Sequence, residues 1–421
     1  MRNLTNLARR RNLFIGAGFA ALLGALVIGQ AALQKTVAAQ NSGAMAPHFE
    51  VDPLWPKPLP NHWVLGMTIG VFVEPNDHVW IIHRSSATLA NNEKPLELKT
   101  GECCAGAPPV LEFDQAGNLL RHWGGPGEGF EWPDSNHGIF IDYKGNVWIG
   151  GNGPPDSQLL KFTKDGKFLL QVGKKGARRK EGATASPGGG EGAVAGFVGG
   201  SNDTENFGRV AKIFVDQKEN EAYIADGYLN KRVAVLDADT GKMKRWWGAY
   251  GNKPDDTPMP PYDPAAAPTQ QFHNPVHCAD MSVDRLIYVC DRAGDRLQIF
   301  TPEGKFIKEA FYETNTKNAG SVWDIAFSKD PQQRYIYMAD GVNEKVKIVD
   351  RQTLKELTTF GDGGRQPGQF YGVHSIATDS KGNIYTTETY EGKRLQRFIN
   401  KGMAAVTAMN QGALAVWPGS K

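Results

Sequence analysis

The chain has 421 residues, of which 40% are hydrophobic and 22% are charged, so it is long enough to bury a large core. Its net charge of +2 gives no electrostatic reason to expect a nucleic acid or an anionic membrane surface as a partner. The 49 glycines and 25 prolines are typical of a fold with many turns.

The first 39 residues are predicted to be a targeting segment that takes no part in the fold. Three consecutive arginines, residues 9–11, precede an apolar run over residues 13–33, and small residues end the segment at Ala39. The letters RRNLF at residues 10–14 also resemble a twin-arginine export signal. The alternative is an uncleaved membrane anchor, because the apolar run is almost long enough to span a bilayer. Both interpretations place the rest of the chain in the periplasm or outside the cell.

One pattern of about 40–50 residues recurs six times after an extension over residues 40–60. Each copy holds an apolar strand, an acidic turn, two further strands and an aromatic strand that ends at glycine. The copies begin at about Val64, His137, Val210, His277, Val322 and Val373. This repeat resembles the NHL type and predicts an all-β, six-bladed β-propeller over residues 61–421. The letters HFEVDPLW at residues 48–55 are a candidate for the last outer strand.

Two long connections interrupt the repeats, at residues 174–208 and 250–274. Long loops on a rigid repeat scaffold often carry binding residues. The first is rich in glycine and is interpreted as a surface insertion without regular structure. The second is rich in proline and is the better candidate for a binding loop.

The four cysteines suit an oxidising compartment. Cys278 and Cys290 are equidistant from Asp284 in the middle of a predicted hairpin turn, so the hairpin places them opposite each other. A cross-strand disulfide is therefore predicted, with buried free thiols as the alternative. The adjacent Cys103 and Cys104 either form a vicinal disulfide or stay reduced.

Three histidines occupy the same position in alternate copies of the repeat. His137, His277 and His374 each lie five residues before the turn residue that ends the first strand, where the other copies have Ile69, Ala211 and Trp323. First strands of propeller blades line the central channel, so these histidines should converge on the axis. Three neutral imidazoles around one point are typical of a zinc site with an open fourth position. His273 lies off this position and is assigned to a loop.

Further polar residues lie at the ends of the second strands, where each strand enters a loop at one mouth of the channel. Asp226, Asp291, Asp340 and Glu388 share one position, where the first copy has His83. Turn capping explains Asp340. Arg84 and Arg292 come next in the first and fourth copies and suit a carboxylate or an oxyanion, whereas the third copy has Gly227 there, followed by Tyr228. A tyrosine near a dication can act as a base.

These residues together resemble the peptidyl-α-hydroxyglycine α-amidating lyase family over roughly residues 60–400. The matching motifs are HGIFID, DGYLNKRV, NPVHCADM, CDRAGDRLQIF, VHSIATDSKGNIY and IIHRSS. The resemblance implies a zinc ion held by His137, His277 and His374, with Tyr228 as the base and Arg84 and Arg292 holding the substrate. It also implies a structural calcium, but the acidic residue that helps to hold this ion is replaced here by Ser375, which puts calcium in doubt.

The resulting hypothesis is an exported zinc-dependent lyase that cleaves a carbinolamide or a similar hydroxylated C–N bond. Its substrate would be a small or peptide-derived molecule, and a monomer is expected. The main alternative is a non-catalytic propeller that binds a ligand or a protein in the cell envelope, because the fold alone does not determine function. A calcium-dependent, lactonase-like hydrolase is disfavoured, because that class uses carboxylate and amide ligands at the axis.

Overall fold

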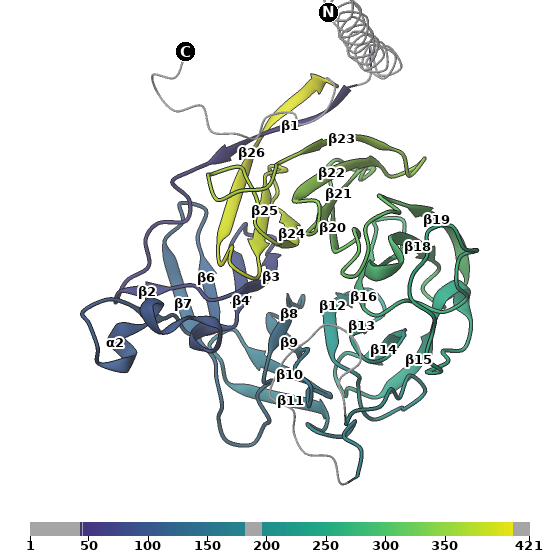
Figure 1. Ribbon diagram of the computed structural model, residues 1–421, viewed down its shortest axis with the longest axis horizontal. Helices are drawn as coiled ribbons and strands as arrows, with labels where there is room; N and C mark the ends of the chain where they lie inside the picture. The colour runs from purple at the N-terminus through teal and green to yellow at the C-terminus, as the bar shows by residue number, and fades with distance from the viewer. Residues whose placement is uncertain (1–42, 44, 182–195, 407–421) are drawn as a thin grey trace, which may run out of the picture.

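The computed structural model describes residues 43, 45–181 and 196–406. The predicted targeting segment and part of the glycine-rich connection lie outside these residues. Six four-stranded antiparallel sheets surround a central axis, which confirms the predicted all-β, six-bladed propeller (Figure 1). In the first five sheets the strands follow one another in sequence from the axis to the rim. Within the described residues, no helix is long and apolar enough to cross a membrane.

Blades one to three are each formed by strands that are consecutive apart from one short insertion. Blade one holds β3 (Thr68–Val73), β4 (Val79–His83), β6 (Val110–Phe113) and β7 (Leu119–Trp123). Blade two holds β8 (Asn136–Ile141), β9 (Asn146–Gly151), β10 (Gln158–Thr163) and β11 (Phe168–Gly173). Blade three holds β12 (Val210–Asp216), β13 (Glu221–Asp226), β14 (Arg232–Asp237) and β15 (Met243–Trp247).

Blades four and five repeat this order, and blade six takes its outer strand from the other end of the chain. Blade four holds β16 (Val276–Met281), β17 (Ile287–Asp291), β18 (Arg296–Phe300) and β19 (Phe306–Phe311). Blade five holds β20 (Asp324–Phe327), β21 (Tyr335–Asp340), β22 (Lys345–Asp350) and β23 (Glu356–Phe360). Blade six holds β24 (Val373–Thr378), β25 (Ile384–Glu388), β26 (Leu395–Ala405) and β1 (Met45–Asp52).

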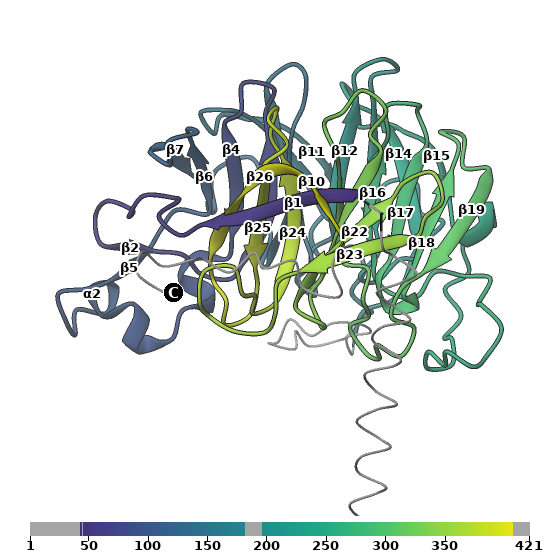
Figure 2. The same cartoon turned by 90° about the horizontal axis from the view of Figure 1, so that it is seen from above.

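An insertion lies between β4 and β6 of blade one. It contains two short 3-10 turns, the single helical turn α2 (Pro95–Leu98) and the short strand β5 (Ala105–Gly106). β5 pairs in parallel with β2 (Trp63–Val64), which precedes β3 in the chain. The insertion also carries a disulfide between the adjacent Cys103 and Cys104, a pairing that the sequence left open. Figure 2 shows the insertion standing out from one side of the ring.

The turn between the first and second strands explains why an acidic residue and Gly-Asn recur in the repeat. In blade two, Asp142 accepts hydrogen bonds from the backbone of Lys144 and Asn146 and from the indole of Trp148. Gly145 has a φ of 77°, a left-handed value that strains other residues. One buried carboxylate thus orders the turn and also satisfies the polar atom of a core tryptophan.

The ring is closed by β1, which pairs with β26 in antiparallel register (Figure 2). Phe49 of β1 is 1% exposed and lies 5.3 Å, centroid to centroid, from both Tyr337 and Phe360 of blade five. The candidate outer strand in the N-terminal segment is therefore in place. The propeller begins at Met45, ahead of the boundary at residue 61 that the repeats alone suggest.

Candidate functional site

Three histidines meet at the axis of the propeller. His137, His277 and His374 come from the inner strands β8, β16 and β24, and one ligating atom of each lies within 4.8 Å of the others. Their ring centroids are 4.8–5.0 Å apart, and all three side chains are buried. The structure therefore brings together the three residues that the repeat register singled out.

Each histidine is oriented by the neighbouring blade. The Nδ1 atom of His137 contacts the carbonyl oxygen of Ala211 at 2.6 Å, and that of His374 contacts the carbonyl of Ile69 at 2.8 Å. His277 makes the same contact with Trp323. A carbonyl oxygen only accepts hydrogen bonds, so each Nδ1 carries the proton and each Nε2 presents a lone pair.

The same surroundings hold the imidazoles in the neutral form. Burial lowers the pKa of His137, His277 and His374 well below their ordinary value of 6.5. The positive charge of Arg292 lowers all three pKa values further, and that of Arg84 adds to the effect at two of them. Neutral imidazole is the form that ligates a metal.

Tyr228 lies next to the histidines. Its hydroxyl is 2.9 Å from Nε2 of His137 and 3.0 Å from Nε2 of His277, and Nη1 of Arg292 donates to the same oxygen at 3.1 Å. The Arg292 guanidinium also lies over the rings of Trp323, at 4.4 Å, and Tyr228, at 5.4 Å. Tyr228 and Arg292 are 2% and 1% exposed, so these contacts form away from bulk water.

The donors and acceptors at this point fit a bound cation. With every Nδ1 protonated, three Nε2 lone pairs face the axis, and the Tyr228 hydroxyl has one proton to offer two of them. A divalent metal would satisfy several lone pairs at once, and three histidines with a fourth position open are a common donor set for zinc. The residues present therefore fit zinc.

Arg84 sits at the edge of the site and is positioned by blade two. Its Nη2 donates to Oδ1 of Asn152 at 3.0 Å, and its Nε donates to the carbonyl of Asn136 at 3.3 Å. It is half-buried, unlike Arg292. Its positive charge acts on the histidines, because it contributes to the lowered pKa of His137 and of His374.

Arg209 is a further member of the site that the sequence analysis did not name. Its Nε donates to the carbonyl of Asn152 at 2.6 Å, and its guanidinium lies 5.6 Å from the centroid of the Tyr228 ring. Asn152 thus contacts both Arg84 and Arg209. A signal was present in the repeat: Arg209 stands two residues before the axial position, where the other copies have Met67, Ser135, Pro275, Ser321 and Gly372.

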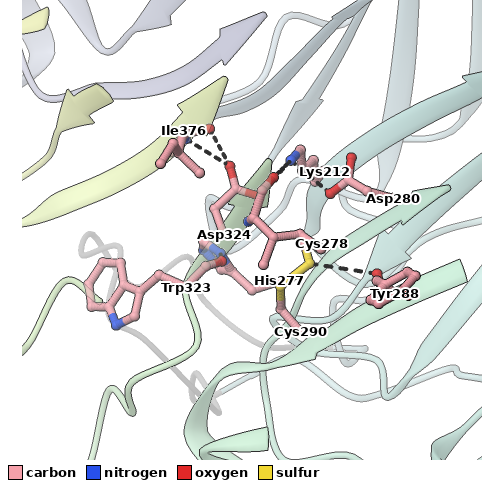
Figure 3. Close-up of a disulfide and its surroundings, with 11 residues drawn as sticks. Lys212, His277, Cys278, Asp280, Tyr288, Cys290, Trp323, Asp324 and Ile376 are labelled. Atoms are coloured by element: carbon pink, nitrogen blue, oxygen red, sulfur yellow. Dashed lines mark hydrogen bonds and ion pairs between the residues drawn. A yellow bond between two sulfur atoms is a disulfide. The ribbon is translucent and has the colours of Figure 1, made fainter. Parts of the chain in front are cut away.

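A second polar cluster lies on the axis, on the opposite side of the histidines from Tyr228. Lys212 donates to Asp280 at 2.9 Å and to Asp324 at 2.5 Å (Figure 3). Ser375 donates to the other oxygen of Asp324 at 2.6 Å. Burial opposes the charge of Lys212, but the two carboxylates outweigh it and raise its pKa. Burial raises the pKa of Asp280 to about 6. The ammonium thus fills the space between the two carboxylates.

The predicted disulfide between Cys278 and Cys290 is present, with a Cα–Cα distance of 4.8 Å (Figure 3). The two residues are direct partners in the pairing of β16 with β17. Cys278 follows His277 in sequence, and Cys290 comes two residues before Arg292. The disulfide therefore joins the strand that carries a metal-ligand candidate, His277, to the strand that ends directly before Arg292.

The acidic residues that end the second strands have structural partners in their own blades. Asp226 accepts from Arg232, Asp291 from Arg296, and Glu388 from Arg394 at 2.5–2.8 Å, while Lys347 lies 3.5 Å from Asp340. Arg232 and Arg296 begin the third strand of their blades and Arg394 directly precedes it, whereas Lys347 is the third residue of β22. The turn-capping interpretation of Asp340 thus extends to an ion pair that recurs around the ring.

No family model matches this chain. Among solved structures, a protein of unknown function from Bacteroides thetaiotaomicron is similar, with a TM-score of 0.50 and 14% identity over 85% of this chain and 77% of that chain. A catalytically inactive virginiamycin B lyase from Staphylococcus aureus with quinupristin has a TM-score of 0.42 and 12% sequence identity, over 85% of this chain and 89% of that chain. A streptogramin B lyase has a TM-score of 0.43 and 13% sequence identity, over 85% of this chain and 98% of that chain. These similarities concern the fold.

Proposed function

We propose that this protein is an exported zinc-dependent lyase that cleaves a carbinolamide or a similar hydroxylated C–N bond, as the resemblance to the amidating lyase family implies. One observation carries the proposal. Three neutral imidazoles present Nε2 lone pairs to the axis, and a tyrosine hydroxyl contacted by a buried guanidinium lies against two of them. The two disulfides, which require an oxidising environment, support a periplasmic or secreted location.

His137, His277 and His374 would hold the zinc ion. When bound, zinc supplies a Lewis acid with an open fourth position, which lowers the pKa of a hydroxyl group placed there. The hydrogen bonds from each Nδ1 to a backbone carbonyl fix the ring orientations and increase the basicity of Nε2. The protein thereby supplies a rigid site.

Tyr228 is the proposed base. In its phenolate form it would take the proton of the substrate hydroxyl, and the oxygen would then form a carbonyl as the C–N bond breaks. The nitrogen leaves with its electron pair and receives a proton, which Tyr228 is placed to return. The hydrogen bond from Arg292 favours the phenolate, because a cationic donor stabilises the charged form of its acceptor.

Arg84 and Arg292 are the proposed substrate-holding groups. A guanidinium binds a carboxylate through two parallel hydrogen bonds, and in a buried site it also stabilises developing negative charge. Asn152 fixes one guanidinium and Tyr228 contacts the other. A substrate with a carboxylate next to the reacting carbon suits this arrangement.

We propose no calcium ion on the axis. The carboxylates of Asp280 and Asp324, which would be the natural oxygen ligands near the histidines, already contact the ammonium of Lys212. Ser375, which replaces the acidic residue of the family pattern, donates to Asp324. An internal ammonium thus supplies positive charge next to both acids.

The proposal is tested by incubating the purified protein with N-acetyl-α-hydroxyglycine and following glyoxylate release, before and after zinc is removed with a chelator. We expect turnover that is lost on chelation and restored by zinc. A protein that binds zinc but releases no glyoxylate above the uncatalysed rate would favour the alternative, a propeller that binds a ligand in the cell envelope without transforming it.

A further inference from the structure

A large groove opens beside the candidate site. We call it the mouth groove and define it by Val198, Tyr228, Met259, Pro261, Tyr262 and Ala293, which line it. Its volume is about 910 Å³, within the range of roughly 300–1,000 Å³ that is typical of small-molecule sites. Tyr228 belongs to both the groove and the histidine site, and Ala293 follows Arg292 in sequence. The groove therefore continues outward from the proposed reaction centre.

The loop between β15 and β16 forms one wall of the mouth groove and is tied down at its base. The ammonium of Lys231 donates to the carbonyls of Asp255 and Thr257 at 3.1 and 2.8 Å. Asp256 accepts a hydrogen bond from the backbone of Ser201 at 2.8 Å. Prolines at 258, 260 and 261 fix the backbone φ over the next stretch. The wall is thus formed before any ligand arrives.

The wall is mainly apolar. Met259 is half-buried and Val198 is 42% exposed, so both keep apolar surface in contact with solvent. The ring of Tyr262 stands edge-on to His273 with the centroids 5.5 Å apart. Exposed apolar side chains gathered along a preformed groove are typical of a ligand site.

We infer that the mouth groove binds an apolar body of the substrate that extends beyond the hydroxylated C–N unit, so that the protein acts on amides with a long hydrophobic acyl or side-chain group. This inference rests on the proposed function. A small hydroxy acid would fill only a minor part of the groove. An extended apolar group attached to the reacting unit would instead cover Met259 and Val198 and displace water from them.

A series of N-acyl-α-hydroxyglycines with acetyl, butanoyl and hexanoyl chains tests the inference. Burial of each methylene should raise kcat/KM roughly 4-fold, or about 200-fold over the four methylenes between acetyl and hexanoyl. Met259→Glu, which places a charge on the wall at a half-buried position, should flatten this dependence. Leu54→Glu, at a residue that is 83% exposed outside the groove, should retain it. Equal kcat/KM across the series in the wild-type protein would overturn the inference and leave the lyase proposal intact.

Affinity measurements test the groove independently of the proposed lyase reaction. The matching N-acylglycines lack the hydroxyl group and are not cleaved, so their affinity can be measured by calorimetry whether or not the protein is a lyase. We expect affinity to increase with chain length in the wild-type protein and in Leu54→Glu, and to depend less on chain length in Met259→Glu. Chain-length-dependent binding without glyoxylate release would support the groove and contradict the lyase. Binding that ignores chain length would contradict the groove.

Discussion

Tyr228 is the residue on which enzyme and binding protein differ most. Substitution by phenylalanine keeps the ring that packs against Arg292 and Arg209 and removes only the hydroxyl. We expect Tyr228→Phe to retain zinc and fold normally while turnover falls about 10²–10⁴-fold, the usual contribution of a positioned general base. Stopped assays of glyoxylate release with metal analysis on the same sample measure both. Near-normal turnover would exclude Tyr228 as the base.

The buried histidines also predict a pH dependence of stability. Their pKa values in the folded, zinc-free protein lie well below 6.5, whereas the unfolded chain takes up protons near 6.5. The unfolded state therefore binds more protons as the pH falls, and the folded state loses stability. Each histidine should cost about 1.4 kcal/mol between pH 7.5 and 5.5.

Urea unfolding of the zinc-free protein at the two pH values measures this loss. Many groups titrate in that range, so the informative quantity is the difference from His277→Gln, which should lose about 1.4 kcal/mol less than the wild-type protein. An identical loss in both proteins would mean that His277 is protonated in the folded state, contrary to its burial.

For single residues, the register of the repeat decided which members of the site could be predicted from the sequence. Equivalent positions in alternate blades had to converge, so His137, His277 and His374 could be selected from nine histidines without coordinates. Arg209 could not be selected in the same way. The repeat marks Arg209 as the one cation at its position, but its role depends on the contact between its guanidinium and the Tyr228 ring, which the spacing alone does not specify.

Among the elements, the hairpin of β16 and β17 connects stability to the site. Its disulfide links residues 12 apart in sequence, and closing a loop of this size in the unfolded chain is worth about 3 kcal/mol. We expect the double variant Cys278→Ala/Cys290→Ala to lose about this amount in urea unfolding. The double variant Cys103→Ser/Cys104→Ser is the control, because adjacent residues close almost no chain. Equal losses in the two variants would contradict the loop-entropy account.

The same hairpin shows which contacts a local sequence pattern can predict. Its symmetry about Asp284 was sufficient to predict that Cys278 faces Cys290, because a regular antiparallel pair fixes its own register. No comparable symmetry relates Cys103 to Cys104, and their pairing stayed open. The Lys212 cluster also could not be predicted from the sequence, because it joins β12, β16 and β20 across the axis.

For the whole molecule, closure of the ring depends on β1. Phe49 joins this N-terminal strand to Tyr337 and Phe360 of blade five, and removal of such a buried ring typically costs 3–5 kcal/mol. We expect Phe49→Ala to lower the free energy of unfolding by about 3 kcal/mol or more. Leu54→Ala, at an 83% exposed residue, should change it by less than about 0.5 kcal/mol. A loss below 1 kcal/mol for Phe49→Ala would mean that β1 contributes little to closure.

The sequence predicted the number of blades because each repeat has its own strand and turn pattern. It left the closure as a candidate, since the pairing of β1 with β26 joins segments about 350 residues apart. The mouth groove was indicated only through the length and proline content of one connection. Its walls come from separate blades, which lie next to each other only in the folded ring.

The zinc content of the purified protein tests the central claim most directly. Elemental analysis should find one zinc ion per chain in the wild-type protein and in His62→Ala, whose histidine is exposed and lies outside the site. His137→Ala, His277→Ala and His374→Ala should each lose most of the metal, because two remaining imidazoles cannot hold the geometry of three. Full zinc occupancy in all three variants, or no zinc in a wild-type protein supplied with it, would contradict the metal site and the lyase that depends on it.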